Sequence, residues 1–201
     1  MGVQADRSQR REGRRAEPLG GAERELLERA RRGDREAFAG LIGRYEDRVA
    51  RLAWRLLGWR GEVEDVVQEV FIAAMLNLRK FRGESSFGTW LMALTVNRCR
   101  REQRKRRLRW MLWGRWGKEV EGGEEQAADE PVLTQERSER VRRAVRGLPA
   151  RYREVIVLRY IEQMSIEEIM GVLHLSRSAV EVRLHRGREQ LREVLGEMMK
   201  E

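Results

Sequence analysis

The stretch SIEEIMGVLHLSRSAVEVRLHRGREQLR, residues 165–192, decides the fold of the C-terminal part of the chain. Its opening SIEE, residues 165–168, matches a capping box and predicts the start of a short helix. The motif SAVE, residues 178–181, repeats that signal and predicts a longer helix that runs towards Glu197. Because only a tight connection at residues 173–176 separates the two helices, the pattern predicts a helix-turn-helix.

The longer helix has one apolar face. The apolar side chains are Val180, Leu184, Leu191 and Val194, and the other faces hold Glu181, Val182, His185, Arg186 and Arg188. Reading the major groove requires donors, acceptors and apolar groups on the first turns of a helix, with arginines that contact phosphates. The pattern therefore favours DNA binding, and an ordinary amphipathic helix with solvated charges is the alternative.

The rest of the chain is also predicted to be helical. Apolar residues recur at helical spacing almost throughout, and the prolines at 18, 131 and 149 fall at apparent element boundaries. No convincing alternating strand appears in the sequence. We expect helices from an N-cap at Asp34 to about residue 57, then over 62–78, 90–109 and 149–162, with a loop at 79–89.

The segment KEVEGGEEQAADE, residues 118–130, differs in composition from both flanks. It holds six acidic residues, one basic residue and a pair of glycines, which is typical of a solvated linker. We therefore expect an all-α protein with two small helical domains joined by a flexible linker, the C-terminal domain being the helix-turn-helix. The expected parts are a disordered basic arm at 1–22, an N-terminal domain at 23–109, a linker at 110–133 and a C-terminal domain at 134–201.

The composition favours a polyanionic partner. The 201 residues include 42 lysines and arginines against 33 aspartates and glutamates, a net charge of +9. All but four of the basic residues are arginine, the side chain suited to phosphate and base-edge contacts. One cysteine and two histidines exclude an internal disulfide and a structural zinc site, so we expect no metal and no cofactor.

The sequence predicts a cytoplasmic protein without stable membrane insertion. No apolar run approaches the roughly 18 residues of a membrane span, and the first residues lack the apolar core of a signal peptide. Trp110, Trp113 and Trp116 follow the basic helix at intervals of three. They fit an extension of that helix or a buried contact, and a membrane-surface helix is the less favoured alternative because it would be short.

Positive charge is concentrated between residues 79 and 109, a segment that contains eleven basic residues and only two acidic ones. Phe81, Phe87 and Trp90 lie in or beside the loop that opens this segment. Such a mixture suits stacking of unpaired bases while arginines hold the phosphate backbone. In the alternative interpretation Phe87 and Trp90 are core anchors and the basic run is simply solvated.

The stretch VEDVVQEVF, residues 63–71, places an acidic and amide stripe in this basic chain. Asp65, Gln68 and Glu69 share one helix face, whereas Val66 and Phe71 mostly pack inward. From spacing alone, an ordinary solvated face is the better interpretation.

The sequence resembles the extracytoplasmic-function (ECF) sigma factors, promoter-recognition subunits of bacterial RNA polymerase. The matching stretches, in the order and spacing of the family, are AFAGLIGRY, EDVVQEVFIAA, FRGESSFGTWL, VNRC, LPARYREVIVLRYIEQMSIEEI and SRSAVEVRLHRGREQLR. They cover nearly everything between Asp34 and Leu195 except the linker. The resemblance implies a sigma factor that binds core polymerase and directs initiation without catalytic residues or activity of its own.

The resemblance also implies the site residues and partners. The acidic stripe would dock on a coiled coil of the largest polymerase subunit through Asp65, Val66, Gln68, Glu69 and Phe71. Melted minus-10 DNA would be held by Arg79, Lys80, Phe81, Arg82, Phe87, Trp90, Asn97, Arg98 and Arg101. Minus-35 duplex would be read by Ser176, Arg177, Ser178, Ala179, Glu181, Val182, Arg183, His185 and Arg186. An anti-sigma factor is a further implied partner, and the linker would thread towards the active-site cleft of the polymerase.

The chain departs from the family pattern at several positions. Met92 and Ala93 stand where relatives often have an aromatic and a basic residue, so the resemblance does not carry over the contacts that relatives make there. SAVE replaces the usual Gly-Thr-Val-Lys or Gly-Thr-Val-Arg, and Glu181 suits a cytosine amine better than a phosphate. His174 stands where relatives often have a glycine or another small residue in the turn.

Rival functions explain less of the sequence. A stand-alone DNA-binding repressor or activator would use only the helix-turn-helix, and it leaves the acidic stripe unexplained. An RNA-processing or nucleic-acid-modifying enzyme would need paired carboxylates, a metal cluster or a nucleophile with its base, and no such constellation occurs in the sequence.

Overall fold

A computed structural model describes residues 21–58, 63–113 and 132–198, and this part of the chain is helical without any strand, as predicted. The α-helices are α1 (Gly21–Arg31), α2 (Arg35–Leu57), α3 (Val63–Asn77), α4 (Phe87–Trp113), α5 (Val132–Gly147), α6 (Ala150–Ile156), α7 (Ile166–Leu173) and α8 (Arg177–Met198). A short 3-10 helix, η2 (Leu78–Lys80), follows α3, and a π-helical turn, η3 (Val157–Ile161), continues α6.

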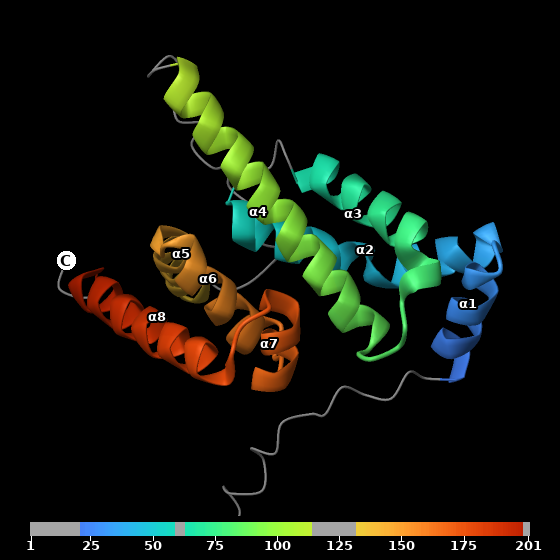
Figure 1. The fold of residues 1–201 in the computed structure, drawn as a ribbon. Coiled ribbons are helices and arrows are strands. Elements are labelled where there is room, and N and C mark those ends of the chain that lie inside the picture. The colour runs from blue at the N-terminus through green and yellow to red at the C-terminus, as the bar shows by residue number, and fades with distance from the viewer. Residues whose placement is uncertain (1–20, 59–62, 114–131, 199–201) are drawn as a thin grey trace, which may run out of the picture.

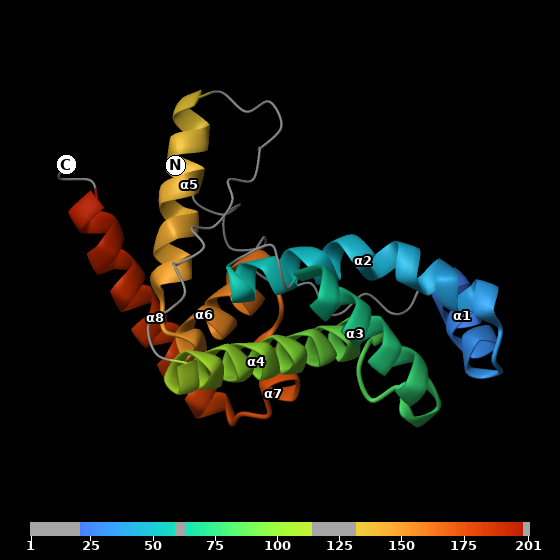
Figure 2. The ribbon, with the colours of Figure 1, turned by 90° about the horizontal axis from the view of Figure 1, so that it is seen from above.

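Helix α4 lies at the centre of the molecule (Figures 1 and 2). It packs against α2 and α3 on one side and against α7 on the other. Helix α1 packs along α2, and α8 packs against α5, α6 and α7. The N-terminal and C-terminal groups of helices therefore touch along α4.

Helix α2 begins and ends as its sequence predicts. The Asp34 carboxylate accepts hydrogen bonds from the backbone N–H of Glu36 at 3.0 Å and of Ala37 at 3.1 Å, which caps the helix. These bonds, the Ala37 bond first, and the neighbouring Arg29 hold the pKa of Asp34 below its usual range. Gly58 ends the helix with a φ of 81°, a conformation that glycine adopts without strain.

Two helix starts differ from the predictions. Helix α4 begins at Phe87 rather than Trp90, because the Ser86 hydroxyl accepts the N–H of Thr89 at 3.0 Å and caps the helix three residues earlier. Helix α8 begins at Arg177 rather than after Ser178, because the Ser176 hydroxyl accepts the N–H of Ala179 at 3.3 Å. The N-terminal helix α1 was not predicted.

The helix-turn-helix is otherwise as predicted. In the capping box of α7, the Ser165 hydroxyl accepts the N–H of Glu168 and the Glu168 carboxylate accepts the N–H of Ser165. Helix α7 ends at Leu173, and the next residue, His174, caps it with a φ of 53° and begins the tight connection that leads into α8. Val180 and Leu184 are buried on the inner face of α8.

The ends of the expected linker are helical in the structure. Helix α4 continues to Trp113, as one of the interpretations of the tryptophan repeat predicts, and α5 begins at Val132. The basic arm up to residue 20, Trp116 and the acidic segment at 118–130 lie outside the described residues. Among the described helices, none is long and apolar enough to cross a membrane.

Candidate functional site

The outward face of α3 carries the predicted acidic stripe. Asp65 and Gln68 are exposed and Glu69 is half-buried. Val66 and Phe71 are only 3% and 8% exposed, so they support this face from inside and do not belong to its outer surface. Three of the five residues predicted for polymerase docking therefore lie together on one accessible face.

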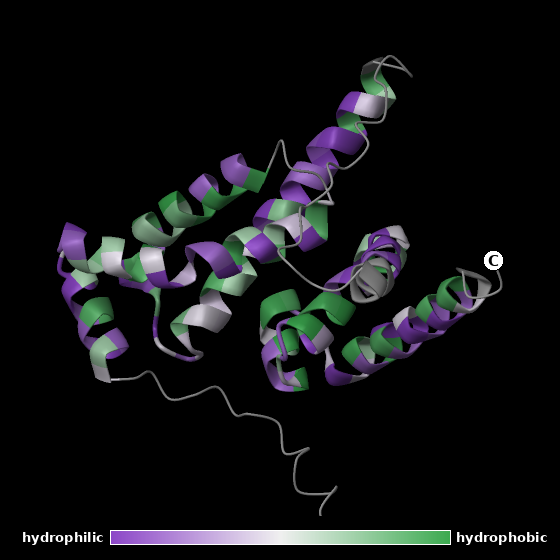
Figure 3. Cartoon of the chain, turned by 180° about the vertical axis from the view of Figure 1, so that it is seen from behind, coloured by the Kyte–Doolittle hydropathy of each residue, from purple (hydrophilic) through white to green (hydrophobic). Residues whose placement is uncertain are grey.

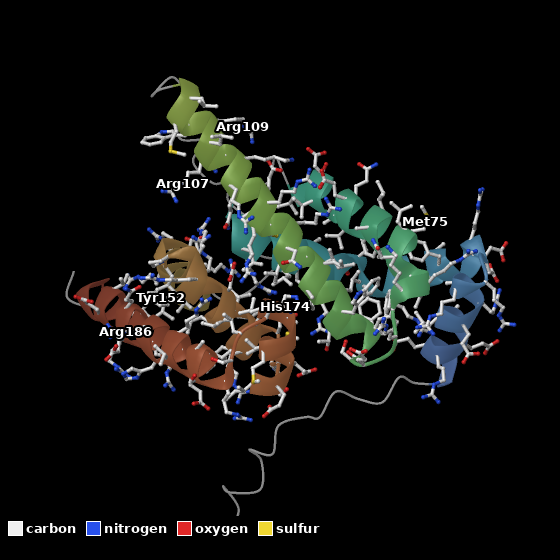
Figure 4. All side chains as sticks on the ribbon, viewed as in Figure 1. Met75, Arg107, Arg109, Tyr152, His174 and Arg186 are labelled. Atoms are coloured by element: carbon white, nitrogen blue, oxygen red, sulfur yellow. The ribbon has the colours of Figure 1, made fainter. Side chains whose placement is uncertain are left out.

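The same face continues into apolar residues that the sequence analysis missed. Ile72, Met75 and Leu76 are 46%, 55% and 70% exposed, which is unusual for large apolar side chains on a well-packed helix. Met75 projects outward from α3 (Figure 4). They follow Asp65 and Glu69 at intervals of three or four, so extending the helical spacing beyond residue 71 is the signal that finds them. We call Asp65, Gln68, Glu69, Ile72, Met75 and Leu76 the α3 face.

A hollow of about 320 Å³ lies between the acidic end of the α3 face and the second half of α4. The lining residues are Asp65, Val66, Gln68, Glu69, Glu102, Lys105 and Arg109. Arg98 of α4 binds the Glu69 carboxylate at 3.0 Å. Arg98, which the resemblance assigned to minus-10 DNA, thus lies beside the acidic stripe, and the minus-10 assignment stays a prediction.

The aromatic residues predicted for the minus-10 site form a packed cluster. The Phe81 ring lies 5.1 Å from Trp90 and 5.9 Å from Phe87, between ring centroids. Phe81 and Phe87 are only 5% and 1% exposed, and Trp90 is half-buried. Arg31 of α1 donates to the Phe81 carbonyl and lies over its ring at 5.4 Å. The burial of Phe87 agrees with the core-anchor interpretation, whereas Trp90 remains partly exposed.

The polar members of the predicted minus-10 set lie at the surface. They are Arg79, Lys80, Arg82, Asn97 and Arg101, all exposed. The arginine-rich second half of α4 is also exposed and extends past the other helices, with Arg107 and Arg109 near its end (Figures 3 and 4). Leu108, Trp110, Met111 and Leu112 interrupt this basic surface and are 53–71% exposed.

The predicted minus-35 residues lie on the outer face of α8. Arg177, Ser178, Glu181, Val182, His185 and Arg186 are exposed, and Ala179 and Arg183 are half-buried. Arg186 projects from the side of α8 away from α4 (Figure 4). Ser176 caps the helix, so its hydroxyl is engaged with the backbone.

Ion pairs order the first turns of this face. Arg177 contacts the carboxylates of Glu167 on α7 and, at 3.6 Å, Glu181 on α8. A backbone hydrogen bond and the Arg177 guanidinium hold the pKa of Glu167 below its usual range. Glu181 lies beside this arginine with its side chain 52% exposed, and Val182 presents an apolar surface that is 58% exposed.

Comparison with protein families gives two matches. Sigma-70 region 2 matches residues 41–109, and Sigma-70 region 4 matches residues 138–191. The first match covers α3 and most of α2 and α4, and the second covers α6, α7 and most of α5 and α8.

Similar proteins cover most of the chain. The ECF RNA polymerase sigma factor SigW of Bacillus subtilis is 33% identical over 187 residues, 86% of this chain and 96% of the relative. The ECF RNA polymerase sigma-E factor of Escherichia coli is 34% identical over 173 residues, 83% of this chain and 90% of the relative. The structure of CnrH in complex with the cytosolic domain of CnrY has a TM-score of 0.63 and 31% identity, covering 87% of this chain and 97% of that one.

One further solved structure supports the fold alone. The sigma factor RpoE of Bartonella quintana, in complex with the anti-sigma factor NepR, has a TM-score of 0.65 at 22% identity. It covers 79% of this chain and 96% of that chain.

Proposed function

The chain belongs to the ECF sigma factors, which direct RNA polymerase to promoters, and we propose that its α3 face is the surface that binds the core enzyme. The observation that carries this proposal is an exposed acidic and apolar face on a chain with a net charge of +9. DNA would repel the carboxylates of this face, so a protein partner is favoured. Catalysis belongs to the polymerase in this proposal.

The two ends of the α3 face suit different contacts with that partner. Asp65 and Glu69 attract basic side chains and guide the encounter. Ile72, Met75 and Leu76 supply apolar area, which contributes roughly 25 cal/mol per Å² when it leaves water. Val66 and Phe71 hold α3 against the core and so keep this face in place.

Melted minus-10 DNA fits the exposed basic surface around the aromatic cluster. Arg79, Lys80 and Arg82 lie on one side of Trp90 in sequence, and Asn97 and Arg101 lie on the other. The asparagine amide both donates and accepts, so it can read a base edge, while the arginines contact phosphates. Phe81 is buried, so it shapes this surface by packing against Phe87 and Trp90.

The outer face of α8 fits the minus-35 duplex. Glu181 can accept a hydrogen bond from a cytosine amine, and Val182 can contact a thymine methyl group. Arg183 and Arg186 are three residues apart, so they share one side of α8 and can contact phosphates there. The likeness to CnrH, which was solved in complex with the cytosolic domain of CnrY, supports a further protein partner. We propose that this partner is an anti-sigma factor and that the chain acts in the cytoplasm.

Charge reversal on the α3 face tests the proposed function. We expect Asp65→Lys with Glu69→Lys to weaken binding to core polymerase at least about tenfold, because two attractive contacts become repulsive. Binding is measured by competition with a labelled sigma factor. The matched control is Glu46→Lys with Asp47→Lys, the same charge change on exposed residues of α2. Equal core affinity of the two double variants would contradict the assignment.

A further inference from the structure

Ion pairs join the N-terminal helices to the C-terminal ones. Arg100 of α4 binds both carboxylate oxygens of Glu154 on α6, at 2.8 and 2.7 Å. Arg48 and Arg55 of α2 each donate to one oxygen of Glu162, at 3.0 Å in both cases. The side chains of Glu154 and Glu162 are only 8% and 6% exposed, so water is largely excluded from these carboxylates.

Two further hydrogen bonds, each with one charged partner, cross the same boundary, from Arg153 and from Thr89. The carbonyl of Leu56, near the end of α2, accepts from Gln103 of α4 at 2.9 Å and from Arg153 of α6 at 2.7 Å. The Thr89 hydroxyl of α4 donates to the Glu168 carboxylate of the α7 capping box at 3.1 Å. The last carbonyls of a helix lack intrahelical partners, so Gln103 and Arg153 satisfy an acceptor that would otherwise be open.

The arginine contacts resemble the binding of a phosphate. A guanidinium that forks onto two oxygens, and two guanidinium groups that share one anion, are arrangements that serve carboxylates and phosphates alike. Arg48, Arg55 and Arg100 remain 38%, 27% and 24% exposed, so they lie at the rim of the boundary. Removal of the two glutamates would present three arginines on adjacent helices.

Promoter recognition requires this boundary to open. Elements at minus-35 and minus-10 lie roughly 25 base pairs apart, about 85 Å of duplex. While α7 packs against α4, α8 and α4 are too close together to reach both elements. The 18 residues between α4 and α5 can span at most roughly 60 Å, so the covalent connection permits the two halves to part widely.

We propose that Arg48, Arg55 and Arg100 form a phosphate-binding surface for DNA that Glu154 and Glu162 of the same chain occupy before promoter binding. The proposal rests on the proposed function, because it places this surface beside the DNA-binding residues of α4. The carboxylates act as an internal substitute for the DNA backbone and hold the free chain closed. Parting of the two halves then exchanges each carboxylate for phosphates.

Energy transfer between two dyes tests the closed state. The dyes are placed at Glu25→Cys on α1 and Glu193→Cys on α8, both exposed, while the native Cys99 is buried. We expect Glu154→Gln with Glu162→Gln to lower the transfer efficiency of the full chain, because three partly exposed arginines lose their charge partners across the boundary. Glu139→Gln, which breaks an exposed pair within α5, leaves the efficiency unchanged.

A charge swap separates this effect from damage to the fold. Arg100→Glu with Glu154→Arg keeps an opposite pair at the boundary, so it is expected to recover more of the transfer efficiency than either single change. Two results would overturn the closed state. One is an unchanged transfer efficiency in the double glutamine variant. The other is a loss of efficiency in the charge swap that equals the sum of the losses caused by the two single substitutions.

Binding of a short random-sequence duplex tests the phosphate surface. The double glutamine variant is expected to bind at least about tenfold more tightly than the parent chain, with a salt dependence steeper by up to roughly 3 in log–log slope, one unit for each released arginine. Adding Arg100→Ala to that variant removes about one unit of the slope. An unchanged affinity and slope in the double variant would overturn the proposal. Binding of the same variants to core polymerase is measured alongside. Failure of the unsubstituted chain to bind core polymerase would contradict the proposed function rather than this inference.

Discussion

His174 makes the turn of the helix-turn-helix at a conformational cost. Its φ of 53° and ψ of 51° lie in the left-handed region that favours glycine, and its side chain is exposed (Figure 4). We expect His174→Gly to raise the free energy of unfolding by about 0.5–1 kcal/mol, since the strain falls and few contacts are lost. Urea denaturation measures the change. His174→Ala, which keeps the strain, serves as control, and a glycine variant no more stable than the alanine variant would refute this explanation.

Cys99 lies on the buried side of α4, and its thiol is neutral there. Burial, with a smaller contribution from the Glu154 charge, raises the pKa of the Cys99 thiol to about 12. Because this pKa lies above that of an unfolded cysteine, near 8.5, the stability contributed by the neutral thiol is full below about pH 8.5 and is lost as pH rises towards 12.

Thiol reactivity checks the protected state of Cys99. At about pH 8 a thiol reagent should label the native chain far more slowly than the urea-unfolded chain, because little thiolate forms and access is blocked. Equal labelling rates in the native and unfolded chains would show that this side chain is not protected.

Residue-level predictions from the sequence succeed where the signal is local. The caps at Asp34 and Ser165 follow from hydrogen bonds within a few residues, so the sequence is sufficient. The outer surface of α3 was less predictable, because Phe71 and Ile72 are both apolar and only the packing of α2 and α4 decides which one is buried.

At the scale of elements, the position of helix α8 depends on a close approach to α6. A Cβ atom at Gly187 would meet Cγ1 of Ile156 at 2.8 Å, and Ile156 is buried. We expect Gly187→Ala to destabilise the fold by about 1–3 kcal/mol through overpacking. The control on the same helix is Gly196→Ala, where nothing lies within 4 Å and the better helix propensity of alanine is expected to help. A thermal melt in which both variants behave alike would contradict the packing argument.

The apolar half of the α3 face provides a second test at this scale. Met75→Lys with Leu76→Lys should weaken core polymerase binding at least about tenfold while leaving the melting temperature nearly unchanged, because both side chains are exposed in the free chain. Val141→Lys, at a comparably exposed position on α5, is the control for added positive charge. Undiminished core binding by the double variant would remove these residues from the interface.

Helix starts show the limit of sequence patterns for elements. Ser178 and Glu181 have the spacing of a capping box, yet Ser176 caps α8. The chain turns at His174, and this turn brings the Ser176 hydroxyl to the N–H of Ala179 in the first turn of α8. Similarly, Ser86 rather than a later residue starts α4. Sequence spacing alone does not decide which of two nearby serines caps a helix. The preceding turn sets the direction in which the backbone enters the helix, and this direction decides which hydroxyl reaches the free N–H groups.

At the scale of the whole molecule, the helical content and the family follow from the sequence, whereas the contact between the two halves does not. Arg100 and Glu154 are 54 residues apart, and Arg48 and Glu162 are 114 apart. In the sequence these are ordinary charged residues on amphipathic helices, with no local signal that pairs them. Their meeting depends on how α4 is placed against α6 and α7, which only the folded chain reveals.

Transcription with reconstituted polymerase tests the central claim most directly. The purified chain is mixed with sigma-free core enzyme and fragmented host DNA, and the 5′ ends of the transcripts are mapped. We expect transcripts that depend on both proteins and start downstream of a shared pair of spaced motifs. Asp65→Lys with Glu69→Lys should abolish most of these transcripts while leaving binding to duplex DNA intact. Tight binding to duplex DNA without any core-dependent transcript would contradict the account and favour a stand-alone repressor.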